Sequence, residues 1–295
     1  MFQIIRHRRI FLAFSALLVV LGVAAFAVWG LKLGIDFTGG TIVQYEGVDE
    51  TARGVLRSTY ADAGLSPVLQ RVGADGVSIR LSELSLDDQA SLRDAVSAAL
   101  PNITETSFET IGPTIGRELR QKAVVATALV LVGIVLYVTW AFRRVSIGPV
   151  RAWVYGAATI IALAHDLVVV IGVFAILGTF FNVEIDSLFV TALLTVLGFS
   201  VHDTIVVFDR IRERLGLTET QQFAETVNES VNQTMVRSLA TSATTLLVLV
   251  ALFLFGGESI RYFTLALVVG IVSGTYSSIF VASPLLVVWE RWRNT

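Results

Sequence analysis

The sequence contains no cysteine and only three histidines among its 295 residues. The absence of cysteine excludes disulfide bonds, thiolate metal sites and thiol nucleophiles. Three histidines, of which His7 lies in a basic N-terminal segment, are too few to favour a histidine-rich metal site. We therefore expect no metal ion and no other cofactor.

Charged residues are also scarce. They make up 16% of the chain, whereas apolar residues make up 54% and the formal net charge is −2. No basic stripe with interleaved aromatic residues is present, so binding to nucleic acid is not indicated. No nucleophile and base occur at a spacing that indicates a hydrolase, and we do not expect an enzyme. The apolar excess is larger than a soluble domain uses and indicates a membrane protein.

Six apolar segments are each long enough to span a bilayer as a helix. They cover residues 10–31, 123–142, 152–181, 188–208, 239–255 and 263–289. The first contains an Ala25-Phe26-Ala27 sequence that resembles a signal-peptide cleavage motif, but its apolar run is longer than such peptides have. We expect it to remain as a lipid-bilayer-spanning helix.

A polar stretch between the fourth and fifth spans has helical periodicity. Phe223, Val227, Val231 and Met235 recur every four residues within residues 217–236. One apolar stripe on a polar helix predicts a helix along the inner membrane face or one packed on the ends of the spans. An ordinary solvated connector is the alternative.

Residues 32–120 have the composition of a soluble domain. Strands are predicted at residues 41–45, 68–72, 77–81 and 103–111, and helices at residues 49–60 and 85–100. Asp75-Gly76 is a strong hairpin signal, and Ser85 could cap the second helix. The order β-α-β-β-α-β predicts a ferredoxin-like domain. The chain thus divides into residues 1–31 with the first span, the domain at 32–120, and residues 121–295 with five spans.

The distribution of arginine predicts the orientation. Twelve arginines lie on the side that carries both chain ends: Arg6, Arg8, Arg9, Arg143, Arg144, Arg151, Arg210, Arg212, Arg214, Arg237, Arg291 and Arg293. The two short loops on the other side, residues 182–187 and 256–262, contain only Arg261. Because basic residues are retained inside, both ends are predicted to be cytoplasmic and the domain to lie outside the inner membrane.

The fourth span carries a histidine and an acid, His202 and Asp203, within its apolar run. A carboxylate in the bilayer interior costs about 2.5 to 3.5 kcal/mol on insertion scales, so its side chain should face protein or water and have a function. Arg237 opens the next span and lies within reach. These two charges could form a pair that is broken when the acid takes a proton, or a static ion pair that fixes the helix register.

Two further polar features lie within the spans. His165 and Asp166 are adjacent in the third span, where they predict a hydrogen-bonded helix contact or part of a water or proton path. Gly270 and Gly274 belong to a small-residue face of the last span that also contains Ser273, Ser277 and Ser278. Its G-x-x-x-G spacing predicts close helix packing.

A glycine-rich turn after the first span contains Gly34, Asp36, Gly39 and Gly40. The segment lacks the Lys-Ser/Thr ending of a phosphate-binding loop. With other segments it resembles the SecF family, subunits of the bacterial Sec protein-export machinery related to resistance-nodulation-division transporters. The matching stretches are residues 34–40, 111–119, 164–166, 203–213, 241–247 and 274–284.

The resemblance implies a partner, SecD, and a task, which is to use the proton gradient to complete transport of an unfolded preprotein through the SecYEG translocon. It implies that Asp203 and Arg237 belong to the proton pathway. His202 departs from the family pattern, since many relatives carry asparagine there, and adds a titratable neighbour to Asp203.

Two other functions are compatible with the same residues. The chain could be half of a small-molecule efflux transporter, although a domain of about 90 residues leaves little room for a substrate-binding apparatus. It could also be a passive membrane scaffold whose charges only hold helices together. Six spans are half the usual number for this transporter type, which predicts a complex with a second six-span subunit.

Overall fold

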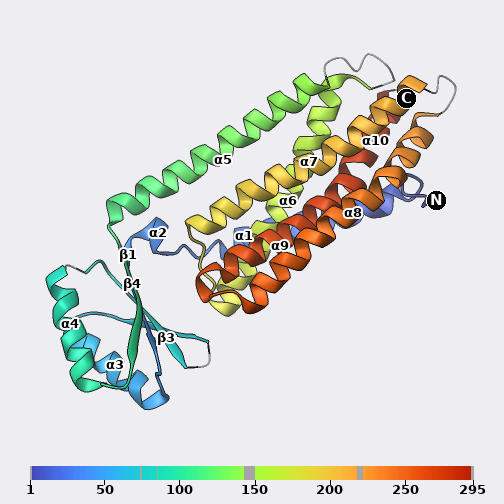
Figure 1. Cartoon of the computed structure of the whole chain (residues 1–295). Coiled ribbons are helices and arrows are strands. Elements are labelled where there is room, and N and C mark those ends of the chain that lie inside the picture. The colour runs from blue at the N-terminus through green and yellow to red at the C-terminus, as the bar shows by residue number, and fades with distance from the viewer. Residues whose placement is uncertain (1, 74, 85, 143–149, 218–221, 294–295) are drawn as a thin grey trace. The chain divides into compact units, whose positions relative to one another are not determined.

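The computed structural model describes residues 2–73, 75–84, 86–142, 150–217 and 222–293. Ser85, Arg143 and Arg144, which entered the predictions above, lie outside these ranges. The chain forms two compact units, Leu33–Val124 and the combination of Met1–Lys32 with Val125–Thr295 (Figure 1). Each unit is described by itself.

Six helices in the described part of the chain are long and apolar enough to cross a membrane, as the sequence predicts. Helices take this role because they satisfy every backbone hydrogen bond within the segment. The first five are α1 (Arg8–Trp29), α5 (Pro113–Ala141), α6 (Ala152–Phe181), α7 (Ser187–Leu217) and α8 (Phe223–Phe255). The sixth consists of α9 (Glu258–Ser277), a π-helical turn η1 (Ser278–Ala282) and α10 (Ser283–Arg293).

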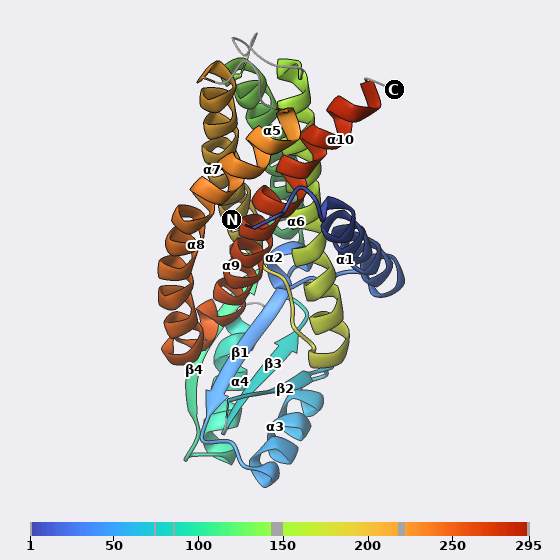
Figure 2. The ribbon, with the colours of Figure 1, turned by 90° about the vertical axis from the view of Figure 1, so that its right-hand side faces the viewer.

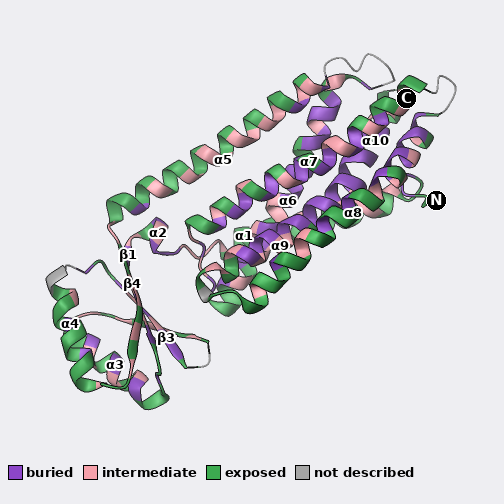
Figure 3. Cartoon of the chain, viewed as in Figure 1, coloured by how far each residue is buried: buried purple, intermediate pink, exposed green. Residues whose placement is uncertain are grey.

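Helix α9 packs against α6, α7 and α8, which makes it the centre of the bundle (Figure 2). Two glycines bring it close to α7. A Cβ added to Gly270 would lie 2.2 Å from Cγ2 of Val196, and one added to Gly274 would lie 2.9 Å from Cβ of Ser200. The facing sides of α6, α7 and α9 are buried, whereas most of α5 is exposed (Figure 3).

The π-helical turn in the sixth span ends two residues before a proline. Pro284 has no N–H and cannot donate the backbone hydrogen bond that an α-helix requires at that position. The hydroxyl of Ser283 instead donates to the carbonyl oxygen of Ser278 at 3.0 Å. Such turns within α-helices are frequent at functional sites, and this one follows the serines of α9 that reach the bundle centre.

The polar stretch after the fourth span is part of α8, which is one continuous helix of 33 residues. Phe223, Val227 and Val231 are buried against the ends of the other helices, at 7%, 0% and 0% exposure. The stripe therefore packs on the spans, and the alternatives of a separate helix on the membrane face and of a solvated connector are wrong. The amides of Asn228 and Asn232 also bind the backbone of Phe2.

The unit Leu33–Val124 has the predicted ferredoxin-like order. Its elements are α2 (Ile35–Thr38), β1 (Gly40–Glu46), α3 (Glu50–Asp62), β2 (Val68–Val72), β3 (Gly76–Leu81), α4 (Leu86–Ala99) and β4 (Thr104–Ile111). The strands form an antiparallel sheet in the order β2-β3-β1-β4. Val43 of β1 pairs with Ile79 of β3 and Phe108 of β4. Helices α3 and α4 supply the rest of the core, including Leu56.

Two tyrosines share a hydrogen bond inside this unit. The hydroxyl groups of Tyr45 and Tyr60 lie 2.9 Å apart, and their side chains are 3% and 1% exposed. Burial raises the pKa of both phenols above the ordinary value, because the phenolate would be held away from water. The pair therefore stays protonated in the folded unit at pH values where an exposed tyrosine begins to ionise.

The glycine-rich turn forms a backbone junction within the same unit. Gly39 and Gly40 have φ values of +75° and +130°, which residues with a Cβ rarely adopt. A Cβ at Gly39 would lie 2.8 Å from Cα of Pro113, the first residue of α5. Gly34 precedes α2 in an extended conformation, and Asp36 lies in the first turn of α2.

Candidate functional site

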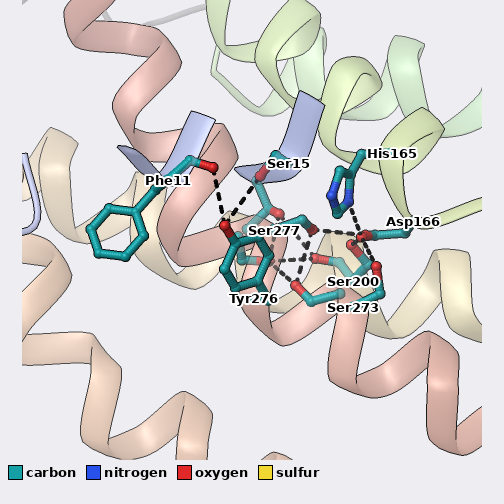
Figure 4. Close-up of polar contacts among 11 residues, drawn as sticks. Phe11, Ser15, His165, Asp166, Ser200, Ser273, Tyr276 and Ser277 are labelled. Carbon is teal, nitrogen blue, oxygen red and sulfur yellow. Dashed lines mark hydrogen bonds and ion pairs between the residues drawn. The ribbon is translucent and has the colours of Figure 1, made fainter. Parts of the chain in front are cut away.

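Asp166 of α6 lies at the centre of the bundle and is fully buried. Three serine hydroxyls donate to its carboxylate: Ser273 to Oδ1 at 2.8 Å, Ser200 to Oδ2 at 2.6 Å and Ser277 to Oδ2 at 2.8 Å. Nδ1 of His165 lies 3.0 Å from Oδ1. One carboxylate thus joins α6 to α7 and α9 (Figure 4).

This number of contacts matches the capacity of an ionised carboxylate. Its two oxygens offer about four acceptor positions, and three hydroxyls and one ring nitrogen fill them. A protonated carboxyl group would lose one acceptor position. Hydrogen bonds to a charged group contribute about 1.5 to 3 kcal/mol each, which offsets the cost of burying the charge. Asp166 is therefore held in one position by partners on α7 and α9.

His165 has a second ring nitrogen in a different environment. The residue is 4% exposed, and its Nε2 has no hydrogen-bond partner among the described residues. The ring stacks on Tyr276 of α9, with ring centres 6.1 Å apart and planes at 28°. The hydroxyl of Tyr276 donates to the backbone oxygen of Phe11 and accepts from Ser15, so α1 is joined to the same network (Figure 4).

Asp203 of α7 is also buried, at 3% exposure, but it is not saturated with partners. Its Oδ2 has no hydrogen-bond partner among the described residues. The hydroxyl of Ser238 on α8 is the nearby polar group, yet it too lies outside hydrogen-bond geometry. His202, the preceding residue in the chain, is exposed. Burial of a charge is costly for both acids, but hydrogen bonds offset the cost at Asp166 and do not do so at Oδ2 of Asp203.

Arg237 is not paired with Asp203 in this structure. Among the described residues neither side chain has an ion pair, and Arg237 is exposed. It lines an open pocket of about 350 Å³ between α7 and α8, together with Val206, Asp209, Arg210, Glu213, Gln233 and Thr234. The order of the spans correctly predicted that Asp203 and Arg237 lie on neighbouring helices. The two side chains differ in environment, because Arg237 is exposed and lines the pocket whereas Asp203 is buried.

Further hydroxyl groups extend the set of polar contacts around Asp166 along α7 and the π-helical turn. Ser200, which donates to Asp166, accepts at its backbone oxygen from Thr204 at 3.0 Å and from Ser278 at 3.3 Å. The hydroxyls of Thr204 and Ser278 are also 3.0 Å apart. Thr204 follows Asp203 directly in the chain. The polar groups between α6, α7 and α9 therefore form one continuous set.

The serine donors were missed as functional groups by the reasoning from sequence. Ser273 and Ser277 were interpreted only as small residues for packing, and Ser200 received no role. Ser273 and Ser277 are four residues apart and so lie on one face of a helix with few other polar residues, and this spacing was the available signal. The turn containing Gly34, Asp36, Gly39 and Gly40 belongs to the other unit and does not contribute to this set of polar groups. Among the described residues no group of acids and histidines is arranged to hold a metal ion.

Comparisons with known proteins agree on one family. Residues 91–292 match the family described as protein export membrane protein SecD/SecF, C-terminal, and residues 24–47 match the SecD/SecF GG motif. The protein translocase subunit SecF of Thermobaculum terrenum is 47% identical over 304 residues, which cover 99% of this chain and 95% of that protein. That of Anaerolinea thermophila is 38% identical, with 100% and 96% covered.

A longer relative has been solved. The crystal structure of SecDF from Thermus thermophilus, described as a translocon-associated membrane protein, superimposes with a TM-score of 0.85 at 38% identity. The match covers 98% of this chain but 39% of that chain. A second SecDF structure, in a form described as super-membrane-facing, gives a TM-score of 0.71 at 36% identity.

Proposed function

We propose that this chain, which belongs to the SecD/SecF family of protein-export membrane proteins, uses the proton gradient to drive late steps of protein translocation across the cytoplasmic membrane. In this proposal Asp203 takes and releases the proton. When α7 and α8 move relative to each other, the guanidinium of Arg237 forms an ion pair with the ionised carboxylate of Asp203. The proposal adds a mechanism and an energy source to the export role of the family.

The unpartnered Oδ2 of the buried Asp203 carries the proposal. Two buried acids lie in one bundle, and only Asp166 has its acceptor positions filled. Protonation of Asp203 removes a charge that the bundle does not compensate, whereas protonation of Asp166 would cost it hydrogen bonds. The uncompensated burial of Asp203 therefore favours binding of a proton there, and the charge left when the proton is released favours movement of neighbouring groups.

The exposed position of Arg237 fits a two-state arrangement. The pocket that it lines lies on the same two helices as Asp203 and Ser238. An ionised Asp203 would attract the guanidinium from this pocket, and a protonated one would release it. One elementary charge crossing a potential of about 100 mV supplies about 2.3 kcal/mol, which is enough to bias two helix arrangements by a factor of about fifty.

The proposal also assigns partners and an orientation. SecD is the expected second six-span subunit, since relatives include a protein named SecDF that contains a region like this chain. We place both chain ends in the cytoplasm and the unit Leu33–Val124 outside, on the basis of the arginine distribution. There the unit would meet the unfolded preprotein as it leaves SecYEG.

The test is a secretion assay in proteoliposomes that contain the chain, SecD and the translocon, with and without an imposed proton gradient. Asp203→Asn and Arg237→Met should each remove most of the stimulation by the gradient while leaving gradient-independent transport intact. Glu225→Gln, which neutralises an exposed acid of α8, is the matched control. Full stimulation in Asp203→Asn would refute proton coupling at this residue and leave the passive scaffold as the better explanation.

A further inference from the structure

A second protonatable group lies in the bundle, away from Asp203. The imidazole of His165 is buried, one of its nitrogens contacts the Asp166 carboxylate, and the other has no partner among the described residues. An ionised carboxylate can only accept, so with Asp166 in that form Nδ1 carries the hydrogen of the contact. The neutral ring therefore has a free lone pair on Nε2.

We propose that Nε2 of His165 is a proton-binding site, and that its occupancy changes the buried His165–Asp166 pair from a single negative charge to a neutral ion pair. A hydronium ion transfers one proton to the Nε2 lone pair, so one N–H bond forms, one O–H bond of the hydronium breaks and a water molecule is left. The inference deepens the proposed proton-driven function and rests on it for its role in transport, but not for the existence of the site.

The surroundings of the ring support both protonation states. In the neutral state the three serine donors compensate the charge of Asp166. In the protonated state the imidazolium lies 3.0 Å from the carboxylate and over the face of Tyr276, where a cation is attracted to the ring electrons. No other titratable side chain contacts the imidazole among the described residues. Two hydroxyls lie one contact further from the ring. Ser15 of α1 donates to Tyr276, and Ser200 of α7 donates to Asp166.

The proton would change how firmly the helices are held. When His165 is charged, it competes with Ser273 and Ser277 for the negative charge of Asp166, and the serine bonds weaken. Both serines lie in the last turns of α9, next to the π-helical turn Ser278–Ala282. The site is therefore placed to loosen α9 from α6 at the point where its helical geometry already changes.

Nitrogen NMR of the histidine rings tests the site directly, because the chain has only three histidines. The protein is labelled with ¹⁵N-histidine in the His7→Gln, His202→Gln background, which leaves His165 alone. We expect the neutral form protonated at Nδ1 at pH 9 and conversion to imidazolium by pH 5. A neutral ring protonated at Nε2, or a spectrum that is unchanged between pH 4 and 9, would overturn the proposal.

Variants test how each neighbouring side chain affects the protonation of His165. Asp166→Asn should lower the imidazolium fraction at pH 5 at least tenfold, and Tyr276→Leu severalfold, whereas Tyr276→Phe keeps the aromatic face and should keep the fraction. If Asp166→Asn does not fold, the two Tyr276 variants still decide, since equal fractions in both would contradict the role of the ring. Asp203→Asn should leave the spectrum unchanged, so the proposed function can fail without affecting this result.

A separate variant tests whether the proton bound at His165 has a role in transport. His165→Asn keeps an N–H near the position of Nδ1 but has no group that can take a proton at Nε2. We expect it to assemble with the partner subunit as the native chain does and to lose at least half of the gradient-stimulated secretion. Native stimulation in this variant would show that the proton bound at His165 has no part in transport.

Discussion

Asp166 and Asp203 are both buried in one helical bundle, yet Asp166 has four hydrogen-bonding contacts and Asp203 has an oxygen with none among the described residues. The difference lies in the helix faces that surround them. Asp166 meets a serine of α7 and two serines of α9, whereas Asp203 lies near Ser238 of α8 without a hydrogen bond to it in the described part of the chain. Two acids of similar burial therefore differ in how far their oxygens are hydrogen-bonded.

The first prediction contrasts amide substitutions of these acids. Asp166→Asn should lower the free energy of unfolding by about 3 to 5 kcal/mol, because donors now face an amide and lose their charged acceptor. Asp203→Asn should change it by no more than about 1 kcal/mol, since no hydrogen bond of the buried oxygen is lost. Reversible unfolding in mixed detergent micelles measures both. Equal losses would contradict the difference in saturation described here.

The second prediction concerns the serine donors. Ser200→Ala and Ser273→Ala should each cost about 1.5 to 3 kcal/mol, the contribution of a hydrogen bond to a charged group. Ser259→Ala, at an exposed position in the first turn of α9, provides the control and should be nearly neutral. The same unfolding assay applies. Because both donors act on one carboxylate, the double variant should differ from the sum of the single variants.

The third prediction tests the close contact between α7 and α9. Gly270→Ala places a Cβ 2.2 Å from Cγ2 of Val196 and should cost about 1 to 3 kcal/mol through overpacking. Adding Val196→Ala should restore part of the loss, which a double-mutant cycle detects. Gly133→Ala in α5, where a Cβ would meet nothing within 4 Å, is the control and should not destabilise the protein. Additive effects of Gly270→Ala and Val196→Ala would argue against this contact.

The fourth prediction concerns alkaline pH. The raised pKa values of Tyr45 and Tyr60 mean that the folded unit keeps protons that the unfolded chain loses above about pH 10. The stabilisation is complete below pH 10 and is lost as the pH rises toward the folded-state values. Limited proteolysis of the unit Leu33–Val124 in the full chain between pH 8 and 11 measures this loss. Tyr60→Phe should flatten the dependence, while Tyr137→Phe, in α5, should not.

Much of the fold could be predicted from hydrophobicity and turn signals. Six apolar segments gave six helices, and the strand and helix order gave the ferredoxin-like unit. A helix was predicted within residues 217–236, with packing on the ends of the spans as one alternative, but its continuity with the fifth span as α8 was not predicted. The burial of Phe223, Val227 and Val231 against other helices depends on tertiary contacts that the sequence pattern does not show.

The candidate site was predicted in part. Burial of Asp203 followed from the cost of a charge in lipid, but its lack of partners did not, because that depends on which faces α8 presents. The partners of Asp166 could not be found from sequence spacing, since Ser200, Ser273 and Ser277 lie 34, 107 and 111 residues away in the chain. A serine on an apolar helix fits both close packing and hydrogen bonding, and only the facing residue decides.

The turn Ser278–Ala282 has a consequence for the two parts of the sixth span. A π-turn contains one residue more than an α-turn, which corresponds to a rotation of about 100° around the axis. The side of α9 that reaches Asp166 and the side of α10 where Trp289 meets Trp153 therefore cannot be drawn on a single helical wheel. Deleting one residue from this turn would bring the two parts into phase and turn one of these surfaces away from its neighbour.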